Sequence, residues 1–234
     1  SWFLVVRLWF DVLPGVVTWS SAQLLAAFGA AAILVGNVVA LRQERLKLLV
    51  AYSTVAQIGY LFLMFPLAFD ATAGALAPGG AQAGGMLQAI SHALAKAAMF
   101  MAAGLIYKAL SHDRIGEMAG IGRALPLTVL TFALAGLALM GLPPSGAFAA
   151  KKLLLDAAAD SGQWWWGAVL DVGGLLTASY VVLVLSHALA PTATPVQLRA
   201  PVSRLAELSA LALALWRGVG LAERAILPQT DGRP

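Results

Sequence analysis

Residues 125–155 read LPLTVLTFALAGLALMGLPPSGAFAAKKLLL, an apolar stretch that is interrupted near its middle. As one continuous helix it would measure about 45 Å, which exceeds the ~30 Å hydrocarbon core of a bilayer. The GLPPSG run cannot continue a regular helix, because proline lacks the amide donor and clashes with the preceding turn. We therefore predict two half-helices that meet inside a membrane, an arrangement that points to a translocation site. The residues of the predicted break are Gly141, Pro143, Pro144 and Gly146.

The composition of the whole chain also indicates a membrane protein. Of its 234 residues, 60% are hydrophobic and only 11% are charged, whereas soluble domains carry about 25% charged residues. The chain has no cysteine, which excludes disulfides, thiolate metal sites and thiol catalysis. The formal net charge is +4, but the cations are scattered singly, so we do not expect nucleic-acid binding.

Further apolar stretches are long enough to cross the lipid bilayer. Residues 1–13 read as the end of another hydrophobic helix whose beginning is absent, because a full span needs about 20 residues. The sequence therefore predicts an all-α, polytopic transmembrane helix bundle with one discontinuous helix. The complete spans expected besides 125–155 are 22–41, 47–66, 86–107, 164–189 and 204–226.

The connecting segments alternate in charge. Links 42–46, 108–124 and 190–203 carry arginine and lysine, whereas links 67–85 and 156–163 carry neither and hold three aspartates. Basic loops lie preferentially in the cytoplasm. We therefore expect an integral membrane protein with its basic links on the cytoplasmic side.

One charged residue, Lys96, falls at the centre of the 86–107 span. A charge there costs about 2.5 to 3.5 kcal/mol on insertion scales, and the side chain is too far from either interface to reach it. His92 and Gln88 lie one and two helical turns earlier, with Ser91 beside them. These residues predict a polar stripe that faces protein or water.

The preceding span carries a second polar stripe, because Ser53, Gln57 and Tyr60 recur on one helix face. We predict that the two stripes pack against each other around water. Because burial disfavours the charged form of an amine, Lys96 could then load and unload a proton, with His92 as a relay.

Other charged residues lie near the predicted break or at a helix start. Lys151 and Lys152 follow the break, and they point about 100° apart, so at most one can face the axis. The other lysine is expected at the interface or paired with Asp156. Asp171 is a candidate partner of a buried lysine, and Lys47 reads chiefly as an interface anchor.

Other chemistries leave no signature. The sequence has no phosphate loop, HExxH, dinucleotide fingerprint or Gly-x-Ser-x-Gly elbow. A Ser/Lys hydrolase would need Ser91 and Lys96 to face each other, but their spacing points them about 140° apart on a helix. We expect no catalytic residue, no cofactor and no metal site in this chain.

Three segments together resemble a known family: LRQERLKLLVAYSTVAQIGY (41–60), ISHALAKAAMFMAAGLIY (90–107) and GLPPSGAFAAKKLLL (141–155). They are similar to the antiporter-like membrane subunits shared by respiratory complex I, membrane-bound hydrogenases and Mrp-type cation/proton antiporters. The resemblance runs from residue 1 to about 190. It looks closest to Mrp-like D subunits and the related subunit 5 of complex I.

This resemblance implies a fold of fourteen helices with two inverted five-helix repeats, each containing a broken helix. Residues 1–13 would be the end of helix 8, residues 14–190 the second repeat, and residues 191–234 the last helix and a tail. The glutamate and lysines that the family places on helices 5, 7 and 8 would lie upstream of Ser1. The resemblance therefore implies membrane subunits as partners, including a chain or segment that supplies the first repeat.

The resemblance also implies roles for single residues. His92 and Lys96 match the histidine and lysine of helix 11, and Lys151 matches the charged residue after the break in helix 12. Lys152 stands where such proteins usually have an aromatic or apolar residue. The implied function is the C-terminal half of a proton-translocating subunit in a complex I-like (NADH:quinone oxidoreductase-like) or Mrp-type assembly. The implied location is a bacterial plasma membrane, and partners would supply the energy.

Two alternatives remain open from the sequence. The chain could be an independent secondary transporter that binds a small anion at its buried lysines. It could also be a structural membrane scaffold in which the lysines are neutral or paired.

Overall fold

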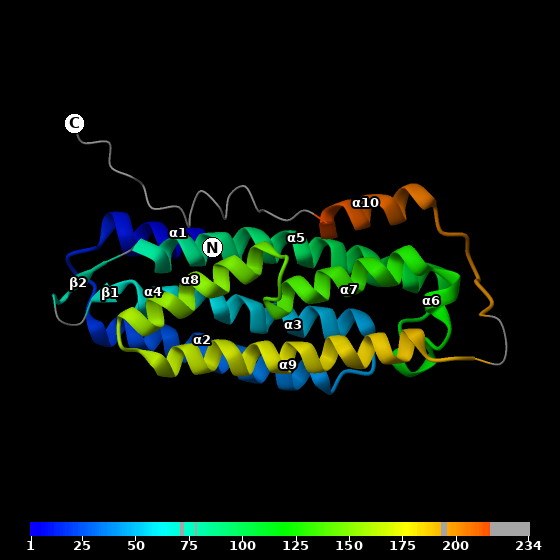
Figure 1. Cartoon of the computed structure of the whole chain (residues 1–234), viewed down its shortest axis with the longest axis horizontal. Coiled ribbons are helices and arrows are strands. Elements are labelled where there is room, and N and C mark those ends of the chain that lie inside the picture. Colours follow the sequence, from blue (N-terminus) through cyan, green and yellow to red (C-terminus); the bar gives the residue numbers. More distant parts are fainter. Residues whose placement is uncertain (71–72, 78, 193–195, 216–234) are drawn as a thin grey trace.

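The computed structural model describes residues 1–70, 73–77, 79–192 and 196–215. Its long helices lie side by side along one axis (Figure 1), as expected for a transmembrane bundle. Among the described residues, four helical segments are long and apolar enough to cross a membrane. They are α2 (Trp19–Leu41), α3 (Leu46–Phe62) continued by α4 (Met64–Leu67), α5 (Gly79–Leu110) and α9 (Trp164–Leu189).

The predicted discontinuous helix is confirmed as α7 (Pro126–Met140) and α8 (Gly146–Asp160). Gly141 ends α7 in the left-handed region, with φ of 72°. The Ser145 hydroxyl begins α8 by accepting the Phe148 amide proton over 3.1 Å, as N-cap residues do. Gly146 was predicted to lie within the break, but it is the first residue of α8.

The remaining elements are short. A two-stranded antiparallel hairpin lies in the link between α4 and α5, and α10 packs along α5 and α7 (Figure 1). Residues 216–226 of the span predicted at 204–226, and the tail to residue 234, lie outside the described residues. The short elements are α1 (Trp2–Arg7), η1 (Leu8–Val12), β1 (Phe69–Asp70), β2 (Ala75–Leu76), η2 (Ile115–Glu117), α6 (Ile121–Ala124) and α10 (Arg204–Leu215).

Helix α5 begins at Gly79, earlier than the predicted residue 86. Glycine has low helix propensity, but it also permits close helix contacts. A Cβ on Gly85 would lie 2.2 Å from the Met64 sulfur, and one on Gly84 would lie 3.1 Å from the Ala150 carbonyl oxygen. Close tertiary packing against α4 and α8 therefore extends the helix through these glycines.

The basic connectors meet at one end of the bundle, which we call the basic end. The Leu46 amide donates to the Asp113 backbone carbonyl over 2.7 Å, and the Ile115 amide donates to the Glu44 backbone carbonyl over 2.8 Å. The Gly120 amide donates to the carbonyl of Ala190, which lies in the third basic connector. The hairpin and the start of α9 lie at the opposite, acidic end (Figure 1). The predicted alternation of the links therefore corresponds to two separate ends.

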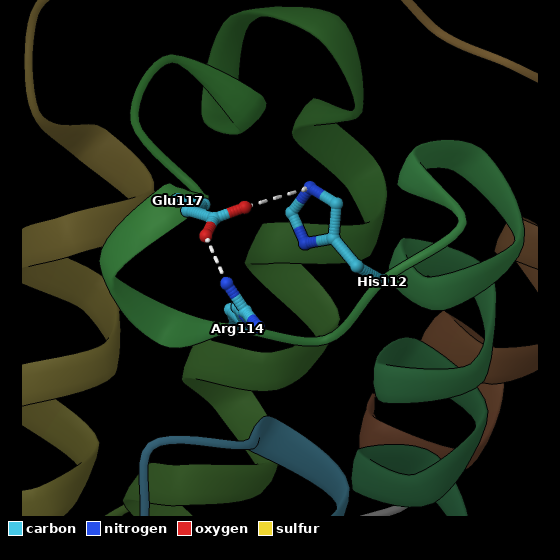
Figure 2. A network of polar contacts seen from close by, with 3 residues as sticks. All are labelled: His112, Arg114 and Glu117. Atoms are coloured by element: carbon cyan, nitrogen blue, oxygen red, sulfur yellow. Dashed lines mark hydrogen bonds and ion pairs between the residues drawn. The ribbon is translucent and has the colours of Figure 1, made fainter.

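An ion-pair network at the basic end holds one arginine in place (Figure 2). The Arg114 Nη1 atom donates to Glu117 over 3.0 Å, and His112 Nε2 lies 3.7 Å from the other Glu117 oxygen. The hydrogen bond from Arg114 to Glu117, together with the carboxylate charge, raises the pKa of Arg114 above its ordinary value. Arg114 therefore stays cationic at this membrane edge.

Small residues bring α2 and α3 into backbone contact. A Cβ added at Gly59 would lie 2.4 Å from the Gly29 carbonyl oxygen, and one at Gly36 would lie 2.6 Å from the Ala56 amide nitrogen. In lipid, where apolar burial gives little driving force, such close contacts stabilise helix pairs by van der Waals packing.

Replacement of Gly59 by valine should push α2 away from α3. We expect a loss of about 1 to 3 kcal/mol in stability, because the added methyl groups overpack a contact made by backbone atoms. The midpoint of thermal unfolding in detergent measures the effect. Gly104→Val is the matched control, because a Cβ at this glycine of α5 meets nothing within 4 Å. Equal midpoints for both variants would contradict the packing argument.

Candidate functional site

A chain of polar side chains crosses the interior between two apolar cores. Along α3, Val50 belongs to a core shared with α5, α7 and α9, and Tyr60 belongs to a second core shared with α2, α4 and α8. Ser53 and Gln57 lie between them and are completely buried. The polar site is therefore enclosed by packed helices.

Lys96 is buried to 5% exposure, and its side chain reaches from α5 to α3. Its Nζ atom donates to the Val50 carbonyl oxygen over 3.1 Å and to the Ser53 hydroxyl. Within the described part of the chain, no carboxylate forms an ion pair with Lys96. A neutral amine and an ammonium can both make these two donor bonds, so the site suits a group that exchanges a proton.

The predicted contact between the two polar stripes is also present. Gln88 Nε2 of α5 donates to Gln57 Oε1 of α3 over 3.3 Å. Gln57 Nε2 in turn donates over 3.1 Å to the Leu139 carbonyl oxygen, in the last turn of α7. The amide that would normally bond this carbonyl belongs to residue 143, which is proline and has no N–H. A side chain of α3 therefore satisfies a carbonyl that the helix break leaves free.

Beyond the break lies Lys151, whose Nζ is 2.9 Å from Asp171 Oδ1. This pairing agrees with the expected role of Asp171 as a lysine partner. The stem of Lys151 passes Gly141, where an added Cβ would lie 3.0 Å from Lys151 Cδ. A Cβ on Gly174 would lie 3.0 Å from Lys151 Nζ and 3.4 Å from the Met140 carbonyl oxygen. Gly141 and Gly174 thus make room for Lys151 beside the Met140 carbonyl. This carbonyl also lacks a helical partner, because residue 144 is proline.

A cavity of about 10 Å³ lies between the lysine and the polar stripes. This volume is close to the roughly 10–15 Å³ that one water molecule needs. Its polar lining comes from Tyr60, Gln88 and Lys151. The cavity therefore adjoins both Lys151 and Gln88 and has room for about one water molecule.

The polar chain runs obliquely across the bundle. Ser53 lies seven residues after the start of α3 at the basic end, or about 10 Å along the helix axis. Asp171 lies seven residues after the start of α9 at the acidic end, again about 10 Å. Lys96 is therefore bound in the basic half of the bundle, Lys151 is paired in the acidic half, and Gln57 lies between them.

Three polar residues of the site escaped the sequence analysis, namely Asn37, Thr177 and Tyr180. Asn37 and Thr177 join α2 to α9, because Thr177 Oγ1 donates to Asn37 Oδ1 over 3.3 Å. The Tyr180 hydroxyl is buried near Ser53, Gln57 and Thr177 and makes no hydrogen bond. Two features of the sequence could have indicated these residues. Asn37 is a polar residue in an apolar span, and Thr177 and Tyr180 are spaced to share one helix face.

Several predicted residues lie beside the chain rather than in it. Ser91 lines a separate cavity of about 80 Å³ between α5, α10 and the helix break. Lys152 points outward and pairs with Asp156 over 3.1 Å, as expected for the lysine that does not face the axis. Lys47 lies at the basic end, with its ammonium 3.5 Å from the centre of the Tyr107 ring.

His92 occupies an intermediate position. It is partly buried one turn from Lys96, and its Nδ1 atom is enclosed without a hydrogen-bond partner. Nowhere in the described ranges do three His, Asp or Glu side chains gather as metal ligands would. The titratable groups in or beside the polar chain are Lys96, His92, Lys151 and Asp171.

Comparisons with known proteins place the chain in a family. The profile of the NADH:quinone oxidoreductase/Mrp antiporter transmembrane family matches residues 1–177. The NADH-quinone oxidoreductase subunit N of Desulforudis audaxviator is 37% identical over 168 residues, which cover 71% of this chain and 31% of that protein. The NADH-quinone oxidoreductase subunit L of Mycobacterium tuberculosis is 32% identical over 171 residues, which cover 70% of this chain and 25% of that protein. The chain thus spans about a quarter to a third of the length of these relatives.

Solved structures share the fold. A chain of the Mrp complex from Dietzia sp. superposes with a TM-score of 0.81 at 23% identity, over 95% of this chain and 48% of that one. A chain of respiratory complex I from Thermus thermophilus gives a TM-score of 0.70 at 20% identity, over 88% and 44%. The resemblance expected from three segments is confirmed, and the chain is an integral membrane protein that belongs to the NADH:quinone oxidoreductase/Mrp antiporter transmembrane family.

Proposed function

We propose that this chain translocates protons across the membrane, as one half of an antiporter-like unit. Protons enter from the basic end, reach Lys96, and pass the helix break to Lys151 and Asp171 in the acidic half. The observation that carries the proposal is the Lys96 amine, which is buried, is bonded to Ser53 and Val50, and has no carboxylate partner among the described residues. An ammonium buried in this way is costly, so the amine is suited to give up its proton.

Unpaired polar atoms support a hydrated path. The Tyr60 and Tyr180 hydroxyls and His92 Nδ1 are buried without hydrogen-bond partners in the structure. Buried polar groups are nearly always satisfied by protein or water. We therefore assign water molecules to these positions, where they would join Lys96, His92 and the cavity beside Lys151.

The size of the cavity favours a proton over a larger substrate. About 10 Å³ beside Lys151 leaves room for about one water molecule. A small organic anion needs several times this volume. This observation supports the proton pathway over the anion transporter that the sequence left open.

The exposed side of the ion pair indicates a partner. The Asp171 side chain is 62% exposed, at a depth of about 10 Å from the start of α9. A carboxylate facing lipid at that depth is costly. Because the relatives are named as subunits of larger enzymes, we propose that another membrane subunit or a segment carrying the first repeat covers this face. The partners would supply the driving energy, in a bacterial plasma membrane whose cytoplasmic side faces the basic end.

Replacement of Lys96 by methionine should abolish proton translocation while the assembly stays intact. We expect the rate to fall to less than roughly a tenth, because the variant lacks the proton-exchanging group. The measurement is acidification of inside-out vesicles that contain the complete assembly, energised by NADH or by an imposed cation gradient.

A second variant, Lys96→Arg, separates proton exchange from a structural role. Arginine keeps the positive charge and the donors but does not release its proton in proteins. Both variants should therefore lose transport. Normal transport by Lys96→Met would instead support the structural scaffold, and rescue by Lys96→Arg would show that a fixed charge suffices.

The two adjacent lysines after the break should differ in importance. Lys151→Met removes a group next to the break and leaves Asp171 unpaired, so we expect translocation to fall roughly tenfold or more. Lys152→Met removes an exposed surface pair with Asp156, which contributes about 0–1 kcal/mol, and should leave the rate within about twofold. Vesicle acidification, normalised to the amount of assembled complex, measures both. Equal losses in the two variants would refute the assignment to Lys151.

A further inference from the structure

The Gln57 side chain lies between Ser53, which binds Lys96, and the helix break that precedes Lys151. It is completely buried, and both ends of its amide are engaged, by the Leu139 carbonyl oxygen at 3.1 Å and by Gln88 Nε2 at 3.3 Å. Ser53, which binds Lys96, lies one helical turn before Gln57 on α3. The cavity that adjoins Lys151 is lined by Gln88, Leu139 and Tyr60.

A carboxamide cannot serve as a proton carrier in this position. It has two donors and an acceptor, but it neither gains nor loses a proton near neutral pH. The hydrogen bonds from Lys96 end at Ser53 and Val50, and the Gln57–Gln88 pair lies one helical turn further along α3. A water molecule must replace one of these amide bonds before a proton can continue to Lys151.

The bond to Leu139 is the one that water can replace. The Leu139 carbonyl has no helical donor, because residue 143 is proline, and a buried carbonyl without a partner is costly. Either the Gln57 amide or a water molecule can satisfy it. At the carbonyl, the two states exchange one neutral hydrogen bond for another, and water must also accept from the released Gln57 amide, because a buried donor without a partner is costly.

We infer that Gln57 is a positioning residue that closes the path between Lys96 and Lys151 by occupying the free carbonyl of the helix break. When its amide leaves Leu139, water takes its place and connects Ser53 and the Tyr180 hydroxyl with the cavity beside Lys151. When the amide returns, the two lysines are separated again. This inference rests on the proposed proton translocation and adds the residue that keeps the path from leaking.

The test is the passive proton permeability of vesicles that contain the complete assembly without an energy source. Gln57→Ala leaves space for permanent water, and the decay of an imposed pH gradient should become about tenfold faster, which corresponds to about 1.4 kcal/mol or one neutral hydrogen bond. Gln57→Leu fills the space with apolar atoms, and it should reduce energised translocation without a leak. A merely structural role would reduce translocation in both variants without any leak.

Gln43→Ala is the matched control, because this amide also donates to a carbonyl near the end of a helix, that of Val39, over 2.9 Å, but at the basic end, where the Arg42 amide bonds the same carbonyl. In vesicles with Gln43→Ala, the imposed pH gradient should decay at the wild-type rate. In Gln57→Ala combined with Lys96→Met, the leak should disappear, because the path passes through Lys96.

Wild-type decay in an assembled Gln57→Ala variant overturns the inference. If that variant does not assemble, Gln88→Ala takes its place, because it removes the bond that orients the Gln57 amide but keeps the Gln57 side chain at Leu139. It should leak less than expected for Gln57→Ala but more than Gln43→Ala, and wild-type decay again overturns the inference. Normal translocation by Lys96→Met alone would refute the proposed function, whereas lost translocation in Lys96→Met without a leak in Gln57→Ala refutes only the role of Gln57.

Discussion

Pro143 and Pro144 lack the two amide donors that would otherwise bond the carbonyls of Leu139 and Met140 in a continuous helix. Inside a bilayer a free carbonyl must find a partner within the protein or in a water-filled cavity. Gln57 takes the Leu139 carbonyl, and the Lys151 ammonium and the Met140 carbonyl both lie against Gly174. A side chain of α3 therefore bonds the first of these carbonyls, and the second lies where α8 and α9 meet.

The two lysines of the site lie in different surroundings. Among the described residues, Lys151 has a carboxylate partner, whereas Lys96 has none and is almost completely buried. The Gln57–Gln88 amide pair lies between them. The proposed stepwise transfer rests on this asymmetry.

Part of the site was accessible from the sequence because helical spacing is local. The stripes of Ser53 and Gln57, and of Gln88, His92 and Lys96, follow from 3.6 residues per turn, and their mutual contact was expected. Asn37, Thr177 and Tyr180 were missed because their contribution depends on contacts between α9 and other helices. Ser91 shares a helix with Lys96, yet it faces another cavity, since a small rotation around the helix decides which neighbour a residue meets.

The sequence by itself determined the membrane environment, the positions of most spans, the break at the two prolines and the separation of a basic from an acidic end. Hydropathy, missing amide donors and loop charge are properties of short segments, so no tertiary contact is needed to read them. The tertiary structure alone decided that Gln57 meets a carbonyl 82 positions away and that Lys151, rather than Lys152, meets Asp171. Such pairings depend on the rotation and axial shift of packed helices, which close contacts such as Gly29 with Gly59 fix only after folding.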